Sequence, residues 1–277
     1  MSRAFEGWYF KHQKGDAALA LIAGKAGDGA FLQVADGERA YHVPFGVKEY
    51  YSTGPAQVRL GGNRFGPDGL ELNVQTEALT LTGTLRYRNL TPLASDIMGP
   101  FRFLPMECCH SVVSMDHDIT GTLTLNGKAL DFTGGKGYIE GDSGCSFPTS
   151  YVWVQCNSFD EPCSVMASAA KIPFCGLKFW GCICAVFYQG REYRLATYRG
   201  ARILKHSQTE LILAQGKYRL EINIQSPAGQ PLYAPHKGSM TRVIHESSNC
   251  EARFRFTKGE SVLFDLTSRH ACFEYVQ

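Results

Sequence analysis

Apolar and polar residues alternate along most of this 277-residue chain, and no other feature of the sequence restricts its fold as strongly. Successive side chains of a β-strand point to opposite faces, so this pattern is typical of half-buried antiparallel strands. The clearest segments are AQVRL (56–60), LELNVQT (70–76), LTLTGTLRY (79–87), TGTLTLNG (120–127), YRLEINIQ (218–225) and CEARFRF (250–256). Gly, Pro, Asn and Asp separate them, as turns require. We predict an all-β protein with short helical pieces only at residues 91–96 and 174–181.

The two halves of the chain resemble each other. Three pairs of segments match in the same order: GWYFKH (7–12) with VWVQCN (152–157), LTLTGTL (79–85) with YRLEINI (218–224), and LDFTGGKGYIE (130–140) with FDLTSRHACFE (264–274). Chance alignment of common strand residues is the alternative for any one match, but three ordered matches favour a duplication. We predict two tandem antiparallel β-barrel domains, residues 1–145 and 146–277. Each has about eight strands around an interior that holds one small ligand.

Charge and hydropathy argue against two classes of partner. Lys and Arg number 28 against 26 Asp and Glu, so the surface does not attract phosphate backbones, and we expect no nucleic-acid partner. The longest apolar runs, AALALIAG (17–24) and CICAVFY (182–188), are far shorter than the roughly 20 residues that cross a bilayer, which predicts no integral membrane segment. The first residues lack the apolar region of a secretory signal, which predicts a cytoplasmic protein.

The ten cysteines are a further feature that needs an interpretation. In a reducing compartment most thiols behave as small buried apolar groups, so we expect few or no disulfides. Cys108-Cys109-His110 and Cys182-x-Cys184 suggest a metal site, but neither has the paired C-x2-C spacing of a zinc site. On a strand, the second pattern places both thiols on one face. We therefore predict no metal.

Four segments spread over the chain carry a recognisable pattern. They are FEGWYF (5–10), the stretch from His110 through Met115 to Gly121, GCSFPTSYVWVQCNSF (144–159) and FDLTS (264–268). Together they resemble the tocopherol cyclase family, and the WVQCN run is the most specific of the matches. In the segment just before Phe147-Pro148 the plant and cyanobacterial enzymes have Lys-Asn-Trp-Gly, whereas this chain has Gly-Asp-Ser-Gly (141–144).

This resemblance implies a fold and an activity. The implied fold is two lipocalin-like domains packed together, as in the carotenoid 1,2-hydratases. The implied activity is the cofactor-free ring closure of a prenylated hydroquinone to a chromanol. The sequence contains no phosphate-binding glycine motif and no nucleophile elbow. Like the family resemblance, it therefore predicts no cofactor.

Ring closure that begins with a proton needs an acid, a dry cavity for the cation and an acceptor for the phenolic proton. A carboxylic acid keeps its proton near neutral pH only where burial in apolar surroundings raises its pKa. Glu140 and Asp142 are our first candidates, followed by Glu107. The alternative for Glu140 is a structural pairing between the two halves, which its match with Glu274 favours. His110 is either a core histidine or a proton acceptor.

Aromatic rings and amides surround these acids in the sequence. A ring face stabilises a cation by about 2 kcal/mol or more where water is excluded. The alternative for Trp8 and Trp153 is that they plug the ends of barrels. Gln155 and Asn157 either orient a quinol hydroxyl or tie the two barrels together. The predicted ligand-contacting residues are Trp8, Tyr9, Tyr138, Phe147, Trp153, Gln155 and Asn157.

Two functions remain open from the sequence. The first is a cofactor-independent cyclase, isomerase or hydratase that acts on a prenylated quinol or another isoprenoid-like apolar substrate. The second is a carrier that binds a hydrophobic small molecule without turnover. Fold alone does not separate them. A buried acid that faces a cavity favours the enzyme, and a purely apolar pocket favours the carrier.

Overall fold

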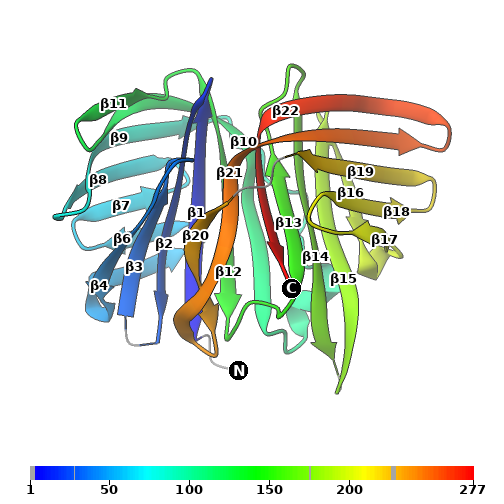
Figure 1. Ribbon diagram of the computed structural model, residues 1–277, viewed down its shortest axis with the longest axis horizontal. Helices are drawn as coiled ribbons and strands as arrows, with labels where there is room; N and C mark the ends of the chain where they lie inside the picture. Colours follow the sequence, from blue (N-terminus) through cyan, green and yellow to red (C-terminus); the bar gives the residue numbers. More distant parts are fainter. Residues whose placement is uncertain (1–3, 28, 175, 226–228) are drawn as a thin grey trace.

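The computed structural model describes residues 4–27, 29–174, 176–225 and 229–277, and it is built almost entirely of antiparallel strands. Two sheets lie side by side, one from the N-terminal half of the chain and one from the C-terminal half (Figure 1). The predicted fold class, all-β with two lipocalin-like units, is therefore confirmed. The boundary between domains 1–145 and 146–277 stays a prediction.

The first sheet is formed by the N-terminal half. Its strand order is β4-β3-β2-β1-β12-β10-β9-β8-β7-β6-β5, with β11 paired to β10. The strands are β1 (Phe5–Lys14), β2 (Ala17–Ala26), β3 (Gly29–Ala35), β4 (Ala40–Gly46), β5 (Tyr50–Gly54), β6 (Gln57–Leu60), β7 (Asn63–Gly66), β8 (Gly69–Gln75), β9 (Thr80–Arg88), β10 (Cys108–Leu125), β11 (Lys128–Asp131) and β12 (Gly135–Gly144).

The second sheet repeats this arrangement. Its order is β16-β15-β14-β13-β22-β21-β19-β18-β17, with β20 paired to β21. Its strands are β13 (Tyr151–Cys156), β14 (Cys163–Phe174), β15 (Leu177–Tyr188), β16 (Arg191–Ala196), β17 (Arg202–His206), β18 (Glu210–Gln215), β19 (Tyr218–Gln225), β20 (Gln230–His236), β21 (Ser239–Lys258) and β22 (Ser261–Val276). The segments matched in the sequence therefore fall on strands with the same place in each sheet: β1 and β13, β9 and β19, and β12 and β22.

The expectation of closed barrels needs a correction. Among the described residues, strand pairing ends at β4 and β5 in one sheet and at β16 and β17 in the other. In the second sheet a side chain spans part of this gap. The amide of Gln215 on β18 accepts from the backbone N–H of Ala196 and donates to the carbonyl of Arg194 on β16, at 3.0 and 3.1 Å.

The strand faces divide the apolar residues into separate cores. The inner face of each sheet buries its own cluster, which includes Trp8 and Phe10 in the first and Val152 and Val154 in the second. A third cluster lies between the two sheets, and it includes Tyr9, Tyr138, Tyr151, Trp153 and Cys272. Both faces of β1 and β13 are therefore buried, one inside a sheet and one against the partner sheet.

A hairpin from the second sheet extends across the first. Strands β20 and β21 lie in the centre of the view (Figure 1), where β21 contacts β2 and β20 contacts β4, and Gln33 of β3 anchors them. Its side-chain amide donates to the carbonyl of Tyr233 at 2.8 Å and accepts from the same residue's N–H at 2.7 Å. The hairpin thereby covers part of the space between the sheets.

Both helical predictions are wrong. Residues 174–181 belong to the hairpin of β14 and β15, where Phe174 pairs with Leu177 and residue 175 lies outside the described residues. Residues 91–96 are irregular. Within the described residues the helical turns are η1 (Val47–Glu49), η2 (Gly99–Phe103) and η3 (Thr197–Arg199), and none is long and apolar enough to cross a bilayer. Cys182 and Cys184 share the inner face of the second sheet, as the C-x-C pattern predicted for a strand.

Candidate active site

The central strand β12 carries chemically different residues on its two faces. Two glycines make room for rings on the inner face, because a Cβ at Gly141 would lie 2.3 Å from Cε3 of Trp8 and one at Gly137 would lie 2.1 Å from Nε2 of His117. The opposite face carries Tyr138, Glu140 and Asp142. The glycines and acids of the central sequence segment therefore reflect the alternation of a strand that is buried on both faces.

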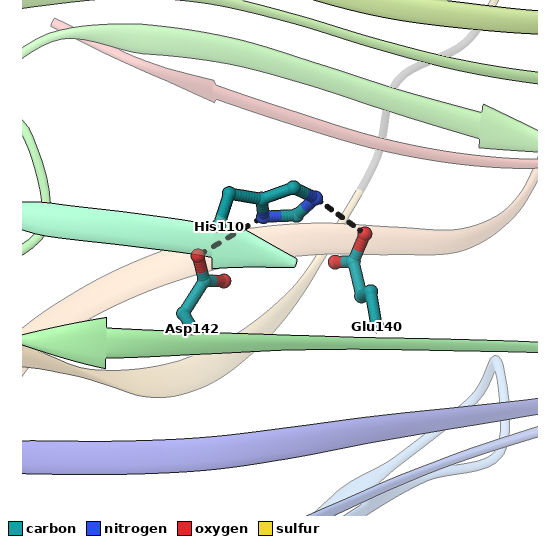
Figure 2. Close-up of side chains that lie close together, drawn as sticks. All are labelled: His110, Glu140 and Asp142. Atoms are coloured by element: carbon teal, nitrogen blue, oxygen red, sulfur yellow. Dashed lines mark hydrogen bonds and ion pairs between the residues drawn. The ribbon is translucent and has the colours of Figure 1, made fainter. Parts of the chain in front are cut away.

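His110 lies between two carboxyl groups (Figure 2). It stands on β10 directly opposite Asp142, and Glu140 is opposite Val112 on the same pair of strands. The ring Nδ1 is 3.0 Å from Oδ1 of Asp142 in a hydrogen bond. Nε2 is 3.2 Å from Oε2 of Glu140, an ion-pair distance whose direction is too oblique for a hydrogen bond. We call these three residues the His110 triad.

The His110 triad favours a charged imidazole. Burial alone would lower the pKa of His110, but the negative charges of Glu140 and Asp142 outweigh it and raise the pKa well above its usual range. A cationic imidazole also offers an N–H to each of its two neighbours, whereas a neutral ring offers only one. Both effects favour the protonated form of His110.

The same residues are the group that could hold a metal ion, because their ligand atoms lie within 4.8 Å of one another. However, Asp142 faces Nδ1 of the ring and Glu140 faces Nε2. A metal ion bound to one of these nitrogens would be next to only one of the two carboxyl groups. The donors therefore bracket the imidazole rather than converge on one point, which fits an ion pair better than a metal site. The absence of a metal stays a prediction.

Glu140 receives donors from both sheets. Tyr138 donates its hydroxyl to Oε2 at 2.6 Å, and the indole N–H of Trp153 donates to the same oxygen at 3.2 Å. Tyr138 and Glu140 belong to β12, whereas Trp153 belongs to β13 of the second sheet. Two hydrogen bonds and the nearby imidazole of His110 therefore meet at a single oxygen of Glu140.

A cavity of about 170 Å³ lies beside the His110 triad, between the sheets. Its wall is predominantly apolar, with rings and aliphatic side chains from both sheets and from the β20–β21 hairpin. Examples are Phe5, Ile22, Phe147, Ile183, Leu232 and Ile244. Phe147 packs edge-on against both Phe5 and Tyr151, which makes a wall of rings at one side. The polar groups of this wall are few and clustered, as in pockets that orient a small molecule.

The structure brings most of the predicted residues to this cavity. Those that line it are Tyr9, Glu107, His110, Glu140, Asp142, Phe147 and Trp153. Tyr138 lies behind Glu140. Trp8, Gln155 and Asn157 do not line the cavity.

Each of these three residues has a structural partner instead. Trp8 packs in the core of the first sheet, because it points to the inner face of β1. Gln155 accepts a hydrogen bond from the buried ammonium of Lys11 at 2.9 Å. Asn157 donates to the carbonyl of Gly137 at 2.9 Å. The two amides therefore tie β13 to the first sheet, which is the structural alternative stated for them above.

Sequence reasoning missed a second pair of acids. Glu246 on β21 and Glu274 on β22 are directly paired across the two strands. Tyr9 donates to Oε1 of Glu246 and Tyr151 to Oε2 of Glu274, both at 2.6 Å. The repeat match of Glu274 with Glu140 was a signal for one of them, but we interpreted that match only as a structural pairing. No motif in the sequence marked Glu246.

Burial raises the pKa values of both acids. The pKa of Glu246 rises to about 7, because burial and the charge of Glu140 outweigh the hydrogen bond from Tyr9. The pKa of Glu274 rises well above its usual range through burial and the neighbouring charge of Glu246. These two carboxyl groups therefore resist ionisation.

Comparison with known proteins agrees with this architecture. Residues 84–275 match the model of a family described as tocopherol cyclase-like. The chain belongs to the tocopherol cyclase-like family. This membership confirms the resemblance drawn from the sequence. No curated protein matches the chain by sequence.

Two solved structures share the fold of this tocopherol cyclase-like protein. Kievitone hydratase from Nectria haematococca superimposes with a TM-score of 0.58 at 11% identity, covering 99% of this chain and 89% of that one. An AttH-like protein from Nitrosomonas europaea superimposes with a TM-score of 0.55 at 13% identity, covering 98% and 92%. At such identities the likeness shows the fold alone.

Proposed function

We propose that this protein is a cofactor-independent enzyme that protonates a carbon–carbon double bond of an isoprenoid-like substrate. The preferred substrate is a prenylated quinol, whose own hydroxyl closes the ring. The reaction takes place in the cavity between the sheets, and the His110 triad handles protons there. The observation that carries this proposal is a histidine ring held between two carboxyl groups at the wall of an apolar cavity.

Each part of the site suits one requirement of this chemistry. The apolar wall excludes water from a tertiary cation, and the aromatic rings of Tyr9, Phe147 and Trp153 line the cavity in which it would form. The carboxyl groups of the His110 triad are within reach of a ligand because Glu140 and Asp142 both line the cavity. Family membership supports ring closure, and one structural neighbour is named a hydratase. Addition of water is the same chemistry with water as the nucleophile.

We further propose that the enzyme works in the cytoplasm with a hydrophobic small molecule as its partner. A carrier remains the rival function, because most of the cavity wall is apolar. The triad argues for turnover: a carrier of an apolar molecule gains nothing from three ionisable side chains at its binding site, and burying them costs free energy.

The test is turnover of a geranylated hydroquinone by the purified protein. We expect an isomeric chromanol, or a product heavier by one water, detected by liquid chromatography with mass spectrometry. Glu140→Gln and Asp142→Asn should each lower turnover roughly 100-fold or more while the circular dichroism spectrum is unchanged. Asp131→Asn, which removes an exposed ion pair with Lys14, is the matched control.

The possible outcomes separate the two functions. Turnover that survives both changes contradicts the assignment of the triad. Binding of the hydroquinone in a stoichiometric complex, without turnover at any pH, establishes the carrier. Extraction of the purified protein and identification of a copurified lipid would then show which apolar molecule occupies the cavity.

A further inference from the structure

The polar groups between the two sheets include three pairs of one tyrosine and one glutamate. Each tyrosine hydroxyl lies 2.6 Å from its carboxyl oxygen in the pairs Tyr9–Glu246, Tyr138–Glu140 and Tyr151–Glu274. Glu140 belongs to the His110 triad, but the proposed function gives no role to the other two acids. Both belong to the second sheet, and Glu274 lines the same cavity as Glu140.

Glu274 has acidic neighbours on several sides. On β21 it faces Glu246, and from β12 the charges of Glu140 and Asp142 act on it. On β13 its neighbour is Tyr151, which donates a hydrogen bond. Among the described residues, neither Glu246 nor Glu274 forms an ion pair, and Oε2 of Glu246 has no hydrogen-bond donor.

Two basic side chains lie nearby but are engaged elsewhere. Arg242 on β21 donates to the carbonyls of Pro148 and Thr149, both at 2.7 Å. Lys11 on β1 donates to Gln155 and to the carbonyl of His270, at 2.9 and 3.0 Å. Neither of them forms an ion pair with Glu274 in the described part of the chain. Burial and like charge both favour its neutral form.

Trp153 connects the two acids that face the cavity. Its backbone pairs with that of Glu274, and its indole N–H donates to Glu140 at 3.2 Å. The two carboxyl groups therefore reach the cavity from opposite sheets, next to the same ring. One has His110 beside it and the other has a second acid. Where the surroundings of two carboxyl groups make their pKa values differ, the group with the higher pKa is usually the acid and the other is the base.

We propose that Glu274 is the acid that donates the proton to the double bond and that Glu140 is the base that receives the proton of the nucleophile. This inference rests on the proposed function and answers a question that the sequence left open, namely which acid donates. The first sheet thus supplies the base and the second sheet supplies the acid.

The proposed step balances in atoms and charge. The double bond takes a proton from the carboxyl group of Glu274, which becomes a carboxylate, and a tertiary cation forms next to Trp153. The hydroxyl oxygen of the substrate attacks this cation and forms the new carbon–oxygen bond. Its proton passes to the carboxylate of Glu140. Exchange with water returns one proton to Glu274 and removes one from Glu140.

A measurement without substrate tests the two protonation states. The infrared carbonyl band of a protonated carboxylic acid is distinct from the bands of a carboxylate. At pH 8 we expect wild type to show this band, Glu274→Gln to lose it and Glu140→Gln to keep it. Asp131→Asn, which removes an exposed carboxyl group paired with Lys14, is the matched control and should keep the band. Persistence of the band in Glu274→Gln would overturn the proposal.

Turnover of the geranylated hydroquinone provides the second test. Glu274→Gln should lower turnover roughly 100-fold to 10,000-fold, and Glu274→Asp should restore part of it. If Glu274→Gln keeps the wild-type rate and pH profile while Glu140→Gln is inactive, Glu274 is not the acid although the proposed function stands. If wild type itself is inactive, the proposed function fails, whereas the infrared result still decides the charge of Glu274.

Discussion

Glu140 and Glu274 occupy matching positions in the two sheets and show how one neighbour changes the chemistry of a carboxyl group. Each lies on the strand that pairs with the first strand of its sheet, and each accepts a tyrosine hydroxyl at 2.6 Å. The next strand differs. In the first sheet β10 supplies His110, whereas in the second sheet β21 supplies Glu246.

The comparison teaches that duplication of a fold does not duplicate the site. A cation next to Glu140 stabilises its charge, and an acid next to Glu274 opposes charge on that residue. In the proposed assignment, two copies of one strand arrangement therefore present an ion pair and a neutral acid to a single cavity. Either copy alone provides only half of what an acid-initiated addition requires.

The largest effect is expected from His110→Asn, which removes the cation that distinguishes the two sheets. Two carboxyl groups then lie together without a positive charge. We expect turnover to fall roughly 100-fold to 10,000-fold, and the free energy of unfolding at pH 7 to fall by roughly 3–5 kcal/mol. Steady-state rates and urea unfolding measure the two effects. Unchanged stability would show that the ion pair of His110 is not formed in solution.

Glu246→Gln tests the acid pair of the second sheet by the pH dependence of stability. Glu246 has its pKa raised from 4.5 to about 7 in the folded state. Below pH 4.5 Glu246 is neutral in the folded and the unfolded state, so its burial does not lower the free energy of unfolding through ionisation. As the pH rises to about 7, the unfolded state releases the proton that the folded state keeps, so wild type loses stability.

The variant lacks this titration. Relative to wild type, we expect the free energy of unfolding of Glu246→Gln to rise by roughly 3 kcal/mol between pH 4 and pH 8. Urea unfolding at both pH values measures this difference. Asp118→Asn is the control, because Lys136 lowers the pKa of this half-buried carboxyl on β10 and its loss should give no such gain. Equal stability differences at the two pH values would show that Glu246 ionises normally and would remove the contrast between the sheets.

Smaller effects are expected from the paired variants Tyr138→Phe and Tyr151→Phe. Each removes a hydroxyl that donates at the same distance, but to carboxyl groups of different charge. A hydrogen bond to a charged group contributes about 1.5–3 kcal/mol and one to a neutral group about 0.5–1.5 kcal/mol. We expect Tyr138→Phe to lower the free energy of unfolding at pH 7 more than Tyr151→Phe does. The reverse order would exchange the charge states of Glu140 and Glu274.

The sequence predicted much of the fold because alternation and the repeat are local signals. The helix predicted for FCGLKFWG (174–181) was wrong. This segment has no alternation, and only the pairing of β15 with β14 makes it part of a hairpin. Barrel closure also depends on contacts between distant edges, such as those of Gln215, that no local pattern records.

The candidate site was predicted in part. His110 stands in a segment that resembled the family, Glu140 and Asp142 stand just before another, and the structure brings the three together. The role of Trp8 was harder to predict, because both faces of β1 are buried and alternation cannot tell the inner core from the space between the sheets. Glu246 lies in an ordinary strand segment, VIHESSN (243–249), and only its pairing with Glu274 shows that it matters.

The central claim is that the cavity adds a proton to carbon, and turnover in deuterium oxide tests it most directly. With a geranylated hydroquinone as substrate, the proton of the acid exchanges with the solvent before it reaches the double bond. We predict a chromanol, or its hydrated counterpart, that carries one carbon-bound deuterium per molecule by mass spectrometry. A product without carbon-bound deuterium would contradict the account, because its ring would have closed without protonation of the double bond.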